Sequence, residues 1–173
     1  MHFLEYYSKN VVKYDLVNKF RFETSTKLPD IKFINLRFNF KKFEVRSLMS
    51  ALIALELITN QKATFITSKK FNVSLKIQKG DPIGCKIVLR KLKMRQFLYQ
   101  LLNKMELKKK IETLNSNKLS LYSFKINNVL IFNSLEKNYK FFKNLKDLHI
   151  GIGTSNLKFN NFKFLLQSYK IIV

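Results

Sequence analysis

Cysteine is nearly absent from this sequence, since Cys85 is the only one in 173 residues. A single cysteine excludes a disulfide framework and a zinc site built from cysteines. With four glycines and two prolines, the chain is neither collagen-like nor a flexible linker. No apolar run approaches the roughly 20 residues that a membrane-spanning helix needs. We therefore expect one folded domain, residues 1–173, that does not span a membrane.

Acidic residues are also scarce, and this scarcity sets the charge of the chain. The 11 Asp and Glu face 33 Lys and Arg, which gives a net charge of +22. Hydrophobic residues make up 46% of the chain, which is enough for a core and excludes a disordered basic tail. So large a positive charge predicts a polyanionic partner, and RNA, DNA and an acidic membrane surface are the candidates.

Four segments have the apolar spacing of three and four residues that is typical of amphipathic helices. The stretch 3–20 places Leu4, Tyr7, Val11, Tyr14 and Val17 on one predicted face. The other three predicted helices are 45–58, through Val45, Leu48, Met49, Leu52 and Leu55; 92–106, through Met94 to Met105; and 158–169.

Strict alternation of apolar and polar residues predicts half-buried strands. The predicted strands are 34–41, 73–78, 83–90 and 148–153, with a short apolar strand at 129–132 and an irregular stretch at 113–128. The turn Gly80-Asp81-Pro82 joins two of them into a hairpin. This order predicts the α+β class, a mostly antiparallel sheet with helices packed on one face.

The face of the predicted sheet that points away from the helices carries amides and cations. Its residues are Asn35, Arg37, Asn39, Lys86 and Arg90. Phe38 and Phe40 fall on the opposite face, so base stacking on exposed aromatics is not expected. This pattern favours recognition of the backbone and shape of a folded RNA.

No catalytic site is predicted, because no motif or cluster of reactive residues is present. His2 and His149 have no ligand spacing to another His, Cys or acid, and are interpreted as ordinary polar positions. Cys85 falls on the inward face of a predicted strand, where a free cysteine is usually a small buried hydrophobe. We expect no metal and no cofactor.

One string is more specific. QKGDPIGCKIVLR, residues 78–90, resembles a signature of the bacterial-type large-subunit ribosomal protein five family. YYSKNVVKYDLVNKF resembles the opening helix of that family, and Leu28-Pro29 with the strand at 31–38 is similar too. ALIALELITNQKATFITSKK is similar to an Ala-rich helix followed by Gly-Gln-Lys, and VLIF and DLHIGIGTS have counterparts.

The resemblance implies a structural protein of the large ribosomal subunit, in the central protuberance. It implies contacts to 5S rRNA and large-subunit rRNA through the sheet face with Gln61 and Lys62, which stand in the Gln-Lys string. The family's long basic loop corresponds to residues 67–82. It implies that Lys69, Lys70, Lys76 and Lys79 extend toward the peptidyl-site tRNA and the small-subunit head protein thirteen, among other central protuberance proteins. Little burial is expected to hold this loop in the isolated protein.

The sequence departs from the family at several positions. Of three family positions that face 5S rRNA, only Gln61 is kept, and the others are Arg37 and Val88 here. Asn60 stands where the family has glycine, so a differently shaped turn is expected. An excess of Lys, Asn, Phe and Ile, together with the lack of a convincing import peptide, favours synthesis inside a mitochondrion; a plastid or a bacterial-type cytoplasm is the alternative.

Two other classes of function remain open at the level of sequence. One is a free RNA-binding protein or regulator that is not stably part of a ribosome, against which stands the lack of a helix-turn-helix. The other is an enzyme of RNA metabolism, against which stands the lack of clustered acids or histidines.

Overall fold

The computed structural model describes residues 3–20, 22, 28–40, 44–104, 112–116, 119–145, 147–155, 159–169 and 171. Six strands form one sheet in the order β2-β3-β1-β6-β5-β4. The chain divides into two compact units. Unit 1 comprises residues 1–34, 90–124 and 151–173, and unit 2 comprises 35–89 and 125–150. No helix among the described residues is long and apolar enough to cross a membrane.

The central strands alternate as predicted. In β1 (Ile31–Asn39) the side chains of Ile34, Leu36 and Phe38 are fully buried. The inward positions of β3 (Pro82–Leu89) and β6 (Leu148–Thr154) are buried in the same way. β2 (Thr64–Thr67) pairs with β3, and β4 (Glu112–Ser116) pairs with β5 (Leu119–Ile126), both antiparallel. The α+β class and the mostly antiparallel sheet are thus confirmed; Lys41, at the end of the predicted strand, lies outside the described residues.

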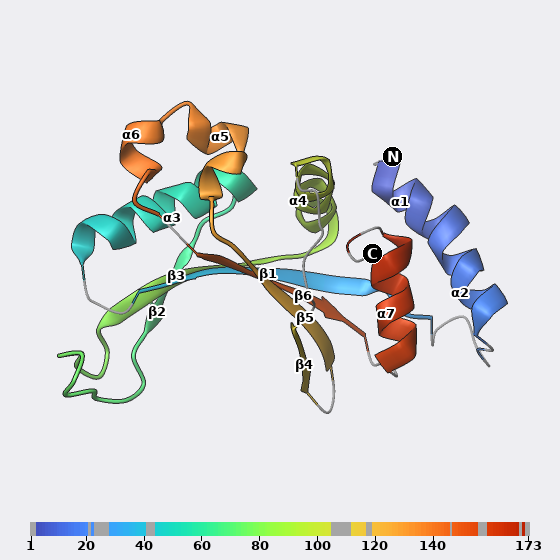
Figure 1. Cartoon of the computed structure of the whole chain (residues 1–173), viewed down its shortest axis with the longest axis horizontal. Helices are drawn as coiled ribbons and strands as arrows, with labels where there is room; N and C mark the ends of the chain where they lie inside the picture. Colours follow the sequence, from blue (N-terminus) through green and yellow to red (C-terminus); the bar gives the residue numbers. More distant parts are fainter. Residues whose placement is uncertain are drawn as a thin grey trace. The chain divides into compact units, whose positions relative to one another are not determined.

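In unit 2 the helices lie on one side of the sheet (Figure 1). α3 (Val45–Thr59) packs on β3, and the short helices α5 (Asn133–Glu136) and α6 (Tyr139–Phe142) pack on α3. The buried face of α3 holds Leu48 and Leu55, as predicted, while Val45 and Met49 from the same predicted stripe are exposed. The sequence therefore placed the helix correctly but not all of its buried face.

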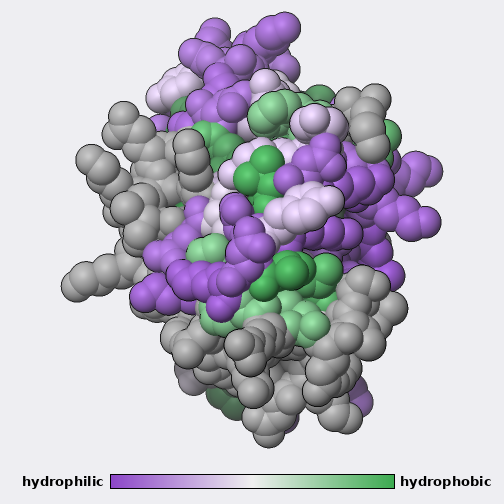
Figure 2. Space-filling model, turned by 90° about the vertical axis from the view of Figure 1, so that its right-hand side faces the viewer, coloured by the Kyte–Doolittle hydropathy of each residue, from purple (hydrophilic) through white to green (hydrophobic). Residues whose placement is uncertain are grey.

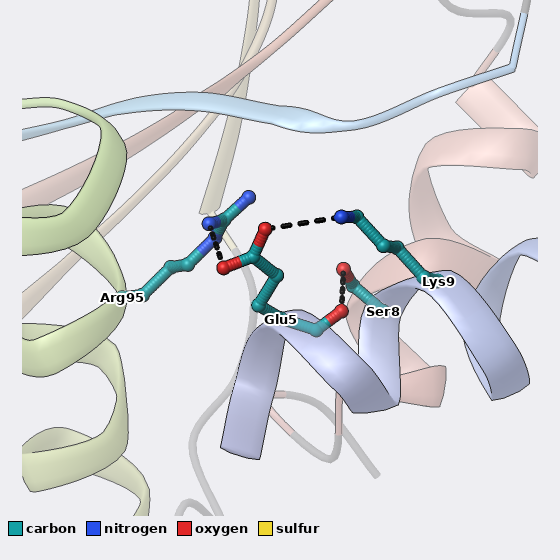
Figure 3. A network of polar contacts seen from close by, with 4 residues as sticks. All are labelled: Glu5, Ser8, Lys9 and Arg95. Carbon is teal, nitrogen blue, oxygen red and sulfur yellow. Dashed lines mark hydrogen bonds and ion pairs between the residues drawn. The ribbon is translucent and has the colours of Figure 1, made fainter. Parts of the chain in front are cut away.

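Unit 1 packs its helices through polar as well as apolar contacts. Its helices are α1 (Phe3–Tyr7), a π-helical turn at Ser8–Val12, α2 (Lys13–Lys19), α4 (Lys91–Lys104) and α7 (Phe159–Ser168). Glu5 on α1 binds Lys9 at 3.1 Å and Arg95 of α4 at 3.0 Å (Figure 3). The hydrogen bond from Lys9 is the main cause that lowers the pKa of Glu5. The Tyr7 hydroxyl donates to the Ser168 carbonyl at 2.9 Å, which joins α1 to α7.

The predicted N-terminal helix exists, but its predicted apolar face is only partly right: Leu4 is buried and Tyr7 half-buried, while Val11, Tyr14 and Val17 are exposed. The buried residues step by four, from Leu4 through Ser8 and Val12 to Leu16. The π-helical turn widens the helix in the middle, which keeps this four-residue series on one side. Tyr14 and Val17 point outward, and green hydrophobic patches interrupt the hydrophilic surface on the side of α1, α2 and α7 (Figure 2).

Three further expectations were wrong, and side-chain capping or alternation explains each. The stretch 113–128 is largely β4 and β5, where Tyr122 and Ile126 alternate with polar residues. The stretch 129–132 is a 3-10 turn, because Asn128 Oδ1 accepts from Leu130 N at 3.1 Å and starts a helical turn. The strand predicted at 73–78 is a turn, in which the Asn72 side chain accepts from Leu75 N. The predicted helices at 92–106 and 158–169 are confirmed as α4 and α7; Met105 lies outside the described residues.

Candidate nucleic-acid interface

The outward face of β1 presents the polar residues that alternation predicts. Asn35, Arg37 and Asn39 point away from the buried side of the strand, and Asn39 is the most exposed of the three. The Oδ1 atom of Asn35 is buried and has no hydrogen-bond donor in the described part of the chain. Arg37 forms no ion pair there either. Its guanidinium is therefore available for an external anion.

Arg37 does not stand alone, because the neighbouring strands bring further titratable groups close to it. His149 on β6 is near enough to Arg37 and to Lys125 on β5 for both cations to repel its protonated form. Burial is the largest cause that lowers the pKa of His149, and the repulsion by Arg37 and Lys125 lowers it further, while Asp147 raises it. Lys125 Nζ is bound by Asp147 Oδ1 at 2.9 Å. β6, which carries His149, thus lies between β1 with the unpaired Arg37 and β5 with Lys125, which is paired with Asp147.

Strand β3 continues this face of the sheet beside β1. Lys86 is exposed there and has no ion-pair partner among the described residues. Val88, two residues on, is partly exposed and contributes an apolar group with no donor. Both strand carbonyls are used: Gln61 Nε2 donates to Val88 O at 3.3 Å, and Thr64 Oγ1 donates to Lys86 O at 3.2 Å.

The turn after α3 holds Gln61 and Lys62 beside this strand. Asn60 ends the helix in the left-handed conformation, with φ 50° and ψ 38°, which glycine usually provides and asparagine tolerates. Asn60 thus adopts the conformation that glycine would provide. The loss of glycine does not require the differently shaped turn that we expected. Glu56 Oε1 accepts from Ala63 N at 3.0 Å and fixes the chain after the turn. Gln61 is half-buried, and Lys62 is exposed.

Arg90 belongs to unit 1, unlike the other predicted residues of the sheet face. It is exposed, and its carbonyl accepts from Met94 N at 3.4 Å at the start of α4. Unit 2 holds the other predicted residues of this face, which are Asn35, Arg37, Asn39, Gln61, Lys62 and Lys86.

The 68–81 loop joins β2 to β3 and carries the four predicted loop lysines. Its outer part is a tight turn: Asn72 and Ile77 bond to each other through both backbone amides, and Lys76 N donates to Val73 O at 3.1 Å. Asn72 Oδ1 also accepts from Leu75 N at 3.3 Å, and Lys76 takes the left-handed conformation. These bonds explain why the alternation of Val73, Leu75 and Ile77 does not form a strand.

The side chains of this loop divide sharply by burial. Only Ile77 is buried between Ser68 and Asp81, whereas Lys69, Lys70, Lys76 and Lys79 are all exposed. Ser68 and Asp81 close the base of the loop with a backbone bond of 2.8 Å. The loop thus presents four cations from a hydrogen-bonded hairpin.

Sequence reasoning missed two residues of this interface. His149 was interpreted as an ordinary polar position, although the alternation of 148–152 already placed it on the outward face of a strand. Lys125 fell in a stretch interpreted as irregular. Their proximity to Arg37 depends on pairing between strands far apart in sequence, for which the sequence holds no signal.

The chemistry of the interface is that of binding rather than catalysis. Among the described residues, no three His, Cys, Asp or Glu side chains lie together as metal ligands would. The Cys85 thiol is buried beneath the sheet, donates weakly to Leu48 O at 3.6 Å, and has its pKa raised by burial to about 11. A thiol of this kind is a packing group and not a nucleophile. What remains exposed are cations and amides, the groups that bind phosphate and sugar.

Comparison with known proteins gives a consistent set of relatives, although no family model matches the chain. It is 28% identical over 177 residues to large ribosomal subunit protein uL5m of Reclinomonas americana, which covers 99% of this chain and 97% of that protein. It is 29% identical over 170 residues to uL5 of Karelsulcia muelleri, covering 94% and 89%. The match with uL5 of Nitrosomonas europaea is 34% over 102 residues, little more than half of each protein at 58% and 56%.

Proposed function

The chain belongs to the uL5 family of large ribosomal subunit proteins, in a mitochondrial-type form, and from this premise we propose that it binds 5S rRNA through the outward sheet face of unit 2. Members of this family are structural proteins, and the chain is a structural constituent of the large subunit and not an enzyme. Its association with the subunit and its rRNA follows from the family. The partners at each surface are our proposal.

The observation that carries the proposal is that two cations on adjacent strands have no carboxylate partner among the described residues. These cations are Arg37 on β1 and Lys86 on β3. Phosphate is the ligand that arginine binds best with its two parallel N–H groups. Asn39, Gln61 and Lys62 add amide and ammonium donors within the same unit. Such a set positions a folded RNA by its backbone and reads no base sequence.

Val88 supports a 5S contact of altered character. A partly exposed isopropyl group next to Lys86 packs against a sugar but donates no hydrogen bond. Arg37 compensates with charge. We therefore expect the RNA contact of this chain to depend more on charge, and on salt, than a face with hydroxyl and amide donors would.

We further propose that the 68–81 loop contacts the peptidyl-site tRNA and the small-subunit head protein thirteen. The support is its four exposed lysines, which a hydrogen-bonded turn presents outside the strands that carry Arg37 and Lys86. Replacing Lys69, Lys70, Lys76 and Lys79 together with glutamine should leave the protein incorporated in large subunits but weaken tRNA retention or subunit joining. Normal joining and tRNA binding at full occupancy would contradict this role, and lost occupancy would assign the loop to assembly.

A mitochondrial ribosome, in the central protuberance of its large subunit, is the proposed location. The support is the full-length match to the uL5m of Reclinomonas americana and the abundance of residues with A/T-rich codons. Bacterial relatives also match at full length, so fractionation is the direct test. The chain should sediment with large subunits from mitochondria, and a free pool alone would favour an RNA-binding regulator outside the ribosome.

The decisive test of the sheet-face proposal is a salt titration with 5S rRNA and the purified full chain. For a phosphate-dominated interface, log K should fall by about 0.7 to 0.9 per neutralised phosphate for each tenfold rise in salt. Removing Arg37 should reduce that slope by roughly one phosphate contact. A flat titration, or a slope unchanged in Arg37→Ala, would contradict the proposal.

A further inference from the structure

The outward face of α3 carries an apolar stripe that the fold of unit 2 leaves uncovered. Val45, Met49, Ile53 and Leu57 follow at intervals of four residues, and they are exposed to 61%, 50%, 45% and 39%. At 1.5 Å per residue the stripe extends for about 18 Å along the helix. Contiguous apolar surface of this kind marks an interaction site more often than a scattered exposed side chain does.

The stripe is one wall of a groove whose other wall is α6. Met49, Ile53 and Leu57 face this groove, and Phe141 on α6, 76% exposed, faces it from the other side. The groove has a volume of about 1070 Å³, and Phe40 after β1 also lines it. In Figure 1, α6 lies alongside the N-terminal part of α3 on the helical side of the sheet. All of these residues belong to unit 2.

The rim of the groove is positively charged. Arg46, Lys140 and Lys143 line it, and none of them forms an ion pair within the described part of the chain. Among the lining residues that the structure describes, Glu44 is the one acid. An occupant that satisfies both features has apolar groups for the floor and carboxylates for the rim.

The floor of the groove fits a polypeptide better than a nucleic acid. The hydroxyls of Ser47 and Ser50 donate to the carbonyls of Glu44 and Ser47, each at 2.9 Å, so they are already used within α3. The α3 wall beyond these serines, with Met49, Ile53 and Leu57, is aliphatic and offers no donor for phosphate. The remaining donors of the lining are the amides of Asn138 and Asn144 and the cations of the rim. A second copy of this chain is also disfavoured, because each copy brings a net charge of +22.

We propose that this groove binds an amphipathic helix of another polypeptide. Apolar side chains of that helix pack on Met49, Ile53 and Phe141, and its flanking carboxylates face Lys140 and Lys143. This is the helix-in-groove mode, in which residues at i, i+3, i+4 and i+7 act as anchors. The groove lies on the helical side of unit 2, whereas the RNA-binding face is the opposite side of the sheet, so either proposal can fail without the other.

The first test uses the full chain and two synthetic peptides of about 18 residues, long enough for helix formation. One carries leucines at i, i+3, i+4 and i+7 with glutamates on the other face. The second has the same composition in scrambled order, which keeps the charge and removes the apolar face. Fluorescence anisotropy should show the ordered peptide bound at least about tenfold more tightly. Equal affinities would mean attraction by net charge alone and would overturn the proposal.

Variants then locate the binding. Ile53→Asp should remove the difference in affinity between the two peptides. The double variant Lys140→Glu with Lys143→Glu should weaken binding of the ordered peptide, and this loss should grow as the salt concentration is lowered. Leu92→Asp on α4 is the matched control, since Leu92 is also an exposed aliphatic residue on a helix, 53% exposed. It should change nothing. A loss as large in Leu92→Asp, or no loss in Ile53→Asp, would overturn the assignment to the groove.

The second test is made in assembled large subunits. A photo-crosslinking amino acid placed at Ile53 should form an adduct with a polypeptide segment that has an apolar face and acidic residues. An adduct with rRNA would assign the groove to RNA, an adduct with a second copy would assign it to self-association, and no adduct would leave it empty; each of these overturns the proposal. Retained 5S rRNA binding by Ile53→Asp shows that the variant is folded.

Discussion

The outward face of β1 and the outward face of α3 belong to the same unit and meet solvent with opposite chemistry. β1 presents Asn35, Arg37 and Asn39, polar groups with one unpaired cation among them. α3 presents Met49, Ile53 and their neighbours, apolar groups with cations only at the rim of a groove. A net charge of +22 predicts a polyanionic partner for the chain but does not say which surface binds it.

The groups around a cation decide what that cation can bind. Beside amides and the half-buried His149, whose pKa is lowered, Arg37 has donors available for a phosphate. Beside a floor of Met49 and Ile53, Arg46 can only complement the charge of an occupant that the floor holds by burial. Partner class is thus read from the neighbours of the charged residues, and the total charge is a weak guide to it.

Substitutions on the two faces of α3 should differ most in their effect on the free energy of unfolding, and this is the largest effect that we expect. Leu55 is fully buried, so Leu55→Ala should lower the free energy of unfolding by about 2–5 kcal/mol through lost burial and a cavity. Ile53→Ala, two residues earlier on the exposed side, should stay within about 0.5 kcal/mol of the parent. Urea unfolding followed by circular dichroism measures both. If Ile53→Ala cost as much as Leu55→Ala, the stripe would be part of the core and the groove would not exist.

The sheet was largely predictable because a strand with one buried face leaves a period of two in the sequence. β1, β3 and β6 were placed by that alternation, and Arg37 and Lys86 followed from it. The apolar stripe of α3 was not separated from its core face, since Val45, Met49 and Leu55 all satisfy helical spacing. The packing of α3 on β3, α5 and α6 decides which of them are covered.

The other errors share a local cause that spacing does not show. Asn72 and Asn128 each accept a backbone hydrogen bond with their side chain, and this starts a turn where the apolar pattern indicated a strand. The π-helical turn after Tyr7 shifts the later buried residues to Val12 and Leu16, away from the face of Tyr14 and Val17 that a regular helix predicts.

A matched arginine pair tests the comparison directly. Arg37→Ala should weaken 5S rRNA binding by about 1–3 kcal/mol, as expected for a hydrogen bond between charged groups. Arg46→Ala removes the same charge from the groove rim and should leave RNA binding nearly unchanged, while it weakens the ordered acidic peptide. Filter binding at one fixed salt concentration measures the first effect and anisotropy the second. Equal RNA losses in the two variants would show that only net charge matters.

Gln61 gives a smaller effect on the same face. Its Nε2 donates to Val88 O at 3.3 Å, so it both supports the turn beside β3 and keeps an amide oxygen for a ligand. Gln61→Ala should weaken 5S rRNA binding by about 0.5–1.5 kcal/mol, the net value of an ordinary hydrogen bond. Gln78→Ala in the 68–81 loop is the control, because Gln78 is an exposed glutamine away from the sheet face. An equal loss in Gln78→Ala would remove the case for Gln61.

His149 should have the smallest effect on stability and RNA affinity, but the direction of each change with pH is well defined. Burial, with repulsion by Arg37 and Lys125, holds the pKa of His149 below its ordinary value, while Asp147 acts the other way. The unfolded chain therefore binds a proton at higher pH than the folded chain, and stability should fall as the pH drops below about 6.5. Bound phosphate would offset Arg37 and Lys125 and raise the pKa again, so RNA binding should take up a proton.

Stability and RNA affinity should thus change in opposite directions as the pH falls from 7.5 to about 5.5, with affinity rising a few-fold while stability declines. His149→Gln removes the titrating group and keeps a polar side chain of similar size, and His2 is present in both proteins as a constant. The variant should lose this part of both pH dependences. If the affinity of the parent fell with acidification, or if the variant kept the same rise, phosphate would not lie near His149, and the RNA-binding face would have to exclude the region between Arg37 and Lys125.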